Sequence, residues 1–132
     1  MLNDKFGQRR RGAVEVTVLE PPEGNVVARG SYFGGPSYEF VVAADGQIYF
    51  RVVGDANMVW AGPDPESFRR IAAAWNHYRV EVGRLPTEEA QVQRVAQLRQ
   101  ELAELGALPT DLPPDPESLW SLLLSEAEFG MA

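Results

Sequence analysis

The chain has 132 residues, of which 45% are hydrophobic and 23% charged, and its formal net charge is −7. This length and composition suit one globular domain with its own core, and they exclude a disordered chain. The sequence holds no cysteine and one histidine, which excludes disulfides and thiolate zinc sites and removes the ligands of most other metal clusters.

The N-terminus and the hydropathy indicate where the protein works. No stretch approaches the roughly 20 apolar residues that a membrane span needs, and MLNDKFGQRRRG at the start lacks the apolar run of a signal peptide. We therefore expect a cytoplasmic protein without a membrane partner. Residues 1–12 are predicted to be a flexible basic arm, and residues 13–132 a single domain.

The first half of the chain has the patterns of strands. AVEVTVLE at 13–20 alternates valine with polar residues, which predicts a half-buried strand. PPEGN at 21–25 predicts a turn, and residues 26–29 start a second strand. A further strand is predicted at 57–61.

Asp45 and Gly46 lie between two β-rich runs, and this dipeptide is the strongest short-range hairpin signal. A two-residue turn pairs Phe40 with Arg51, and it divides the side chains between two faces. One face carries Tyr38, Phe40, Val42, Tyr49 and Val53, and the other Val41, Ala43, Ile48, Phe50 and Val52. Because both faces are largely apolar, we expect these strands inside the sheet or covered on both sides.

The second half has the patterns of helices. PDPES occurs at 63–67 and again at 114–118, and in each copy the aspartate suits an N-cap and the next proline the first helical position. The motif therefore predicts two helix starts, for helices at 65–82 and 116–129, and no longer repeat accompanies it. Between them, Thr87 predicts the cap of a helix that runs through Leu105.

Apolar residues at helical spacing predict the core. The faces consist of Phe68, Ile71, Ala72, Trp75, Tyr78 and Val82, then Val92, Val95, Leu98, Leu102 and Leu105, then Leu119, Trp120, Leu122, Leu123, Leu124 and Ala127. Among these, Phe68, Ile71, Trp75, Trp120 and Leu123 are expected to be buried together with one face of the hairpin. The order of the elements predicts an α+β fold, with an antiparallel sheet of four to six strands in the N-terminal half followed by three helices packed mainly on one face.

The sequence offers no catalytic constellation. His77 lies opposite Phe68 around its helix and faces solvent, and no serine stands in a nucleophile motif. We predict no catalytic residue, no metal site and no cofactor. Two alternatives stay open at this level: a nucleic-acid accessory protein acting through Arg9 to Arg11, and a metal-free hydrolase that uses carboxylates.

The charge of the last quarter of the chain points to a protein partner. From residue 100 onward the chain has seven acids and no base, a field that repels nucleic acid and attracts basic proteins, although many acidic runs are only solvated surface. Glu101 and Glu104 are expected to point outward from the second helix. The predicted partner-binding residues are Glu101, Glu104, Asp111, Glu117, Glu126 and Glu128.

The stretch from Gly34 to Tyr78 resembles the core of the SUKH superfamily of bacterial immunity proteins. It has a glycine-containing loop, a hairpin YEFVVAADGQIYFRV, a strand through VWAG and a capped helix with F-x-x-I. The closing LWSLLLSEAEFG is similar to the last helix of the fourth subgroup. The resemblance implies an α+β immunity protein that neutralises a toxin by binding it. Toxins in such systems are often nucleases or deaminases, and a basic toxin would suit this acidic chain.

Overall fold

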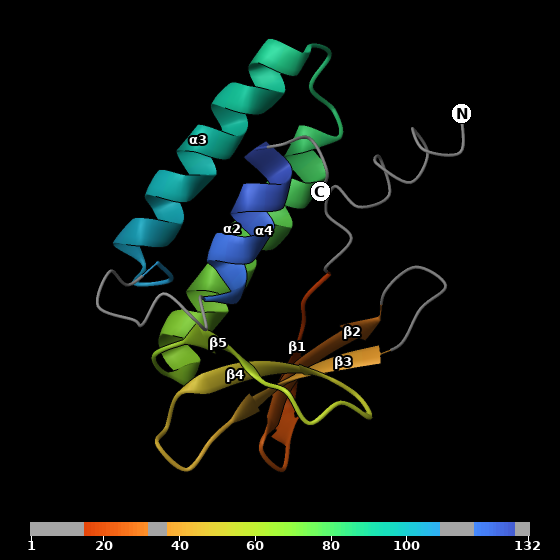
Figure 1. Cartoon of the computed structure of the whole chain (residues 1–132), viewed down its shortest axis with the longest axis vertical. Helices are drawn as coiled ribbons and strands as arrows, with labels where there is room; N and C mark the ends of the chain where they lie inside the picture. The colour runs from red at the N-terminus through yellow and green to blue at the C-terminus, as the bar shows by residue number, and fades with distance from the viewer. Residues whose placement is uncertain (1–14, 32–36, 109–117, 129–132) are drawn as a thin grey trace.

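The computed structural model describes residues 15–31, 37–108 and 118–128, so the predicted arm at 1–12 lies outside the described residues. A five-stranded antiparallel sheet precedes three helices, which confirms the predicted α+β class (Figure 1). The strands lie in chain order in the sheet: β1 (Thr17–Glu23), β2 (Val26–Ser31), β3 (Ser37–Val42), β4 (Ile48–Val52) and β5 (Val59–Gly62). The helices are α2 (Pro65–Val82), α3 (Glu88–Glu104) and α4 (Leu119–Glu128).

The helices form one layer on one side of the sheet (Figure 1). Helices α2 and α4 both contact β5, and α3 packs against α2 and α4. In the part of the chain that the structure describes, no helix covers the opposite face of the sheet, which we call the open face. None of the described helices has the length and apolar character needed to cross a membrane.

The core lies between these two layers. The ring of Phe40 on β3 lies 5.0 Å from that of Phe68 on α2 and stacks on Trp120 of α4 at 6.3 Å, measured between centroids. Trp75 lies 5.8 Å from Trp120. The prediction of a shared core is confirmed for all five of its members, which are Phe68, Ile71, Trp75, Trp120 and Leu123.

The first turn lies later than predicted. Strand β1 continues through Pro21 and Pro22 to Glu23, and the chain reverses at Gly24 and Asn25. The prediction of a turn at 21–25 was wrong because β1 is an edge strand, and an edge strand tolerates proline where the missing N–H would face away from the sheet.

The hairpin forms, but its register differs by one residue from the prediction. Phe40 pairs with Phe50, and Glu39 pairs with Arg51. The Ala43 carbonyl accepts the Gly46 N–H, and the Ala43 N–H reaches the Gln47 carbonyl at 2.9 Å, so the loop has three residues. Gly46 has φ of 81°, which suits the left-handed position of such a loop. Because side chains alternate, the core face holds Tyr38, Phe40, Val42, Ile48, Phe50 and Val52.

Local capping determines the helix starts. The Asp64 carboxylate accepts the Ser67 N–H at 2.8 Å, and the Thr87 hydroxyl accepts the Ala90 N–H at 3.1 Å, as predicted. Helix α4 instead begins at Leu119, because the Ser118 hydroxyl accepts the Ser121 N–H at 3.0 Å. The predicted cap at Asp115 lies outside the described residues.

The predicted apolar faces are wrong at two positions. Val92 on α3 is 59% exposed and Leu122 on α4 is 42% exposed. Buried Arg94 joins Val95, Leu98 and Leu102 on the inner side of α3. Whether a side chain at these positions is buried depends on where the neighbouring helices lie. The periodicity of one helix does not define that arrangement.

Candidate functional site

The structure separates the predicted acidic residues. Glu101 is not free at the surface, since its carboxylate lies 3.4 Å from a guanidinium nitrogen of Arg94. Glu104 is exposed at the end of α3. Glu126 and Glu128 belong to α4 by their backbone, but their side chains lie outside the described residues, as do Asp111 and Glu117 entirely.

Arg94 joins α2 to α3. Its side chain is 5% exposed and forms ion pairs with Glu81 on α2 and Glu101 on its own helix. Its guanidinium carbon lies 5.7 Å from the centre of the Tyr78 ring, within cation–π range. Exposed His77 lies 3.3 Å from the same Glu81 carboxylate. Arg94 is thus a buried cation that links α2 to α3. A buried charge is costly unless it is paired, so Arg94 needs both carboxylates.

Sequence reasoning missed Arg94, although a signal was present. Arg94, Leu98 and Leu102 follow one another at spacings of four residues, which places all three on one helix face. A charged residue on an apolar face is buried when acids from the neighbouring helix can pair with it.

The open face of the sheet carries an apolar row. Val26, Val41, Tyr49 and Trp60 pair successively across β2, β3, β4 and β5. The row points away from the helices, because side chains alternate along a strand and Ile48, next to Tyr49, belongs to the core. Trp60 is 6% exposed and Val41 1% exposed, so both side chains are buried although no described helix lies over them. Trp60 is therefore buried, but on the face opposite the main core.

A hydrogen-bonded relay runs from this row to the hairpin turn. The Trp60 indole N–H donates to the Gln47 side-chain oxygen at 2.5 Å, and the Gln47 amide donates to the Asp45 carboxylate at 3.1 Å. The Tyr49 hydroxyl donates to the same carboxylate oxygen at 2.9 Å. The other oxygen accepts the Gln47 backbone N–H at 2.9 Å. Gln47 and Tyr49 thus hold the exposed Asp45 carboxylate in a fixed position, and Trp60 holds Gln47.

Electrostatics keep this carboxylate charged. The Gln47 backbone N–H, with further help from the Tyr49 hydroxyl, holds the pKa of Asp45 below its ordinary 3.8. Partial burial and the neighbouring Asp45 raise the pKa of Tyr49 above its ordinary 10.0, so the phenol keeps its proton at neutral pH. No basic side chain of the described residues forms an ion pair with Asp45.

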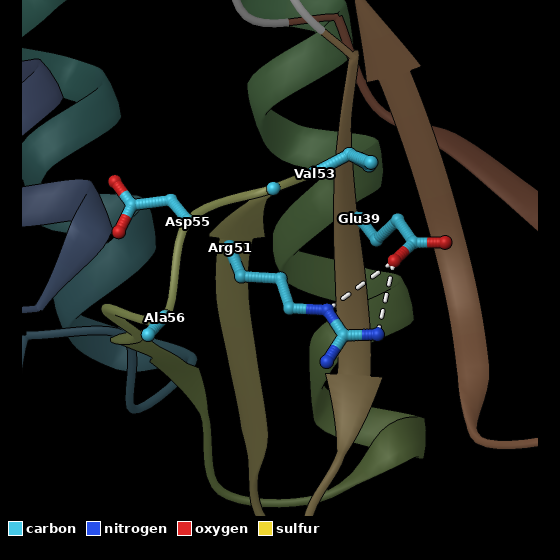
Figure 2. Close-up of a pocket in the computed structure, with 6 residues that line it drawn as sticks. Glu39, Arg51, Val53, Asp55 and Ala56 are labelled. Carbon is cyan, nitrogen blue, oxygen red and sulfur yellow. Dashed lines mark hydrogen bonds and ion pairs between the residues drawn. The ribbon is translucent and has the colours of Figure 1, made fainter.

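A shallow pocket of about 360 Å³ lies elsewhere, beyond the end of β4, and its lining includes Glu39, Arg51, Val53 and Asp55. Arg51 donates from two nitrogens to one Glu39 oxygen, at 3.2 and 3.1 Å. Asp55 follows a turn in which Gly54 has φ of 93°, and its carboxylate accepts the Asn57 N–H. Figure 2 shows the Asp55 carboxylate directed away from the Glu39–Arg51 pair.

This geometry bears on hydrolysis by carboxylates. Of the two acids at the pocket, Glu39 is bonded to Arg51 and Asp55 points elsewhere, whereas a hydrolytic pair must face one scissile bond. Within the described ranges, no group of three or more His, Cys, Asp or Glu residues could hold a metal ion. By contrast, the relay at Asp45 holds an exposed, charged carboxylate on the open face through three hydrogen bonds. This arrangement is suited to binding a cationic group.

Comparisons with family models, with curated proteins and with solved structures find no match.

Proposed function

We propose that the chain is an immunity protein of the SUKH type, which neutralises a basic toxin by binding it. The observation that carries this proposal is the one-sided charge of the last quarter of the chain, with seven acids and no base from residue 100 onward. Such a field accelerates encounter with a basic protein and selects partners, while a few anchor residues supply affinity.

The pairing of charges on the described surface supports this proposal. On and beside β1, the acids have basic neighbours: Glu23 contacts Arg29, and Glu20 lies 3.8 Å from Arg69. By contrast, Glu88, Glu89 and Glu104 of α3 are exposed and form no ion pair with a described residue. The negative charges of these three residues therefore have no basic partner among the described residues. They would attract a basic protein.

Charge reversal tests the proposal. The variant carries Glu104→Lys, Glu126→Lys and Glu128→Lys and spares Glu101, because Arg94 needs that partner. Association with a basic toxin domain encoded by the adjacent gene is measured by stopped flow at low salt, together with growth protection. We expect association about tenfold slower or more, with a melting temperature within a few degrees of wild type.

The matched control carries Glu15→Lys, Glu20→Lys and Glu23→Lys, which changes the net charge equally at β1. Exposed pairs there contribute little stability, so this variant should fold. If both variants slow association equally, overall charge is responsible and α3 and α4 have no special part. If the first variant protects and associates as wild type does, the acidic surface is only solvated.

A further inference from the structure

Among the described residues of the open face, Asp45 carries a charge that no described base pairs with, and hydrogen bonds hold it in place. Two other acids on this face are neutralised by cross-strand or nearby bases, since Glu39 pairs with Arg51 and Glu23 with Arg29. Asp45 has three hydrogen bonds from neutral donors and no base. Neutral donors fix a carboxylate in place but leave its negative charge available to a ligand.

The surroundings of Asp45 favour a protein ligand. Tyr49 and Trp60 lie side by side on neighbouring strands, and both connect to the carboxylate through the relay. Tyrosine is enriched in binding hot spots, and the half-buried Tyr49 ring beside the carboxylate favours a cation over other groups. Trp60 is 6% exposed and acts by holding Gln47 in place. Because the side chains are already held, binding there costs little ordering entropy.

We propose that Asp45, with Tyr49, Gln47 and Trp60 behind it, is a docking point on the open face for a single arginine or lysine of a partner protein. The charge complementarity between this carboxylate and a basic side chain defines the occupant. The open face lies on the opposite side of the sheet from the helices, so this docking point is separate from α3 and its exposed acids (Figure 1).

The test titrates the full-length ¹⁵N-labelled protein with Nα-acetyl-L-arginine methylamide and follows the three tryptophan indole N–H signals by NMR. The Trp60 indole donates into the relay, whereas the Trp120 indole is bonded to the Ala61 carbonyl inside the core. We expect saturable shifts of the Trp60 indole and of the Asp45 and Gln47 amides, with the Trp120 signal unmoved. The citrulline analogue, which has the same shape without charge, should produce none.

Two variants complete the experiment. Asp45→Asn keeps an oxygen for the Gln47 N–H but loses the charge, and it should raise the dissociation constant of the arginine probe about fivefold, as expected for an exposed ion pair. Asp55→Asn is the matched control, because Asp55 is also an exposed turn aspartate that accepts an N–H two residues on, yet it has no relay. That variant should bind the probe as wild type does.

Three results would overturn the inference: no saturable shift, equal shifts with citrulline, or equal weakening by Asp55→Asn. These results are independent of the toxin assay. If the acidic-surface variants do not slow toxin association, the proposed function is wrong but the probe titration can still succeed. If the titration shows no binding, the docking point is wrong but the toxin assay can still succeed.

Discussion

Trp120 donates its indole N–H to the backbone carbonyl of Ala61 at 2.7 Å, and both residues are fully buried. The bond joins the last helix to the last strand across 59 positions of sequence. Buried polar groups must be paired. This hydrogen bond therefore helps to define the position of α4 against the sheet.

Two substitutions of Trp120 should separate the stability that its hydrogen bond contributes from the stability that its packing contributes. Trp120→Phe removes the donor and leaves the Ala61 carbonyl unpaired, which should cost about 1–3 kcal/mol. Trp120→Ala also empties the core and should cost about 3–5 kcal/mol. Urea denaturation followed by circular dichroism measures the free energy of unfolding of both variants. Leu122→Ala, at an exposed position on the same helix, is the control and should lie within about 0.5 kcal/mol of wild type. A wild-type midpoint for Trp120→Phe would contradict the role of the bond.

Arg94→Leu should destabilise the packing of α3 on α2. The change leaves the Glu81 and Glu101 carboxylates without their shared cation, and because these acids are 41% and 37% exposed, water screens them. We therefore expect a cost of about 1–2 kcal/mol for the two pairs together. Arg84→Leu removes the same charge from an exposed site without an ion pair to a described residue and is the control. Adding Glu81→Gln and Glu101→Gln to Arg94→Leu should recover part of the lost stability. No recovery would mean that the arginine acts only by filling space.

The hairpin register depends on Gly46. Gly46→Ala must place a side chain at φ of 81° and should lower the free energy of unfolding by about 1 kcal/mol or more. Gly83→Ala is the control, because Gly83 has φ of −68°, which alanine adopts readily, so that variant should be neutral or slightly stabilised. Equal effects of the two changes would show that the loop does not require the left-handed conformation.

Acid should weaken the cap of α2. The Ser67 N–H lowers the pKa of Asp64 below its ordinary 3.8, so the charged cap stabilises the folded state above that value, and this contribution is lost as pH falls through the lowered pKa. Asp64→Ala should therefore melt at a lower temperature than wild type at pH 7, and the difference should narrow below pH 3.8. A constant difference across this range would show that the charge has no part.

The helix starts and the hairpin show what the sequence alone can predict. The start of α2 follows from Asp64 and Pro65, which act within one turn of backbone. The register of the hairpin does not follow from Asp45 and Gly46, because this pair suits both a two-residue and a three-residue loop.

The candidate sites depend on that register. Only the three-residue loop places Glu39 opposite Arg51 and puts Tyr49 on the open face with Trp60. The sequence-based register put Tyr49 on the same face as Phe40, so the relay from Trp60 to Asp45 could not be foreseen. The acidic residues were visible in composition, but the ion pair between Arg94 on α3 and Glu81 on α2 depends on the packing of two helices.

The two edges of the sheet restrict how this molecule can combine with others. On β1, Pro21 and Pro22 withhold the N–H groups that an added strand would need. On β5, the Ala61 carbonyl is already bonded to Trp120. The prolines interrupt the hydrogen-bonding groups of the β1 edge, and one carbonyl of β5 is already occupied, so these features disfavour the addition of a strand at the described edges and favour recognition through the faces of the molecule.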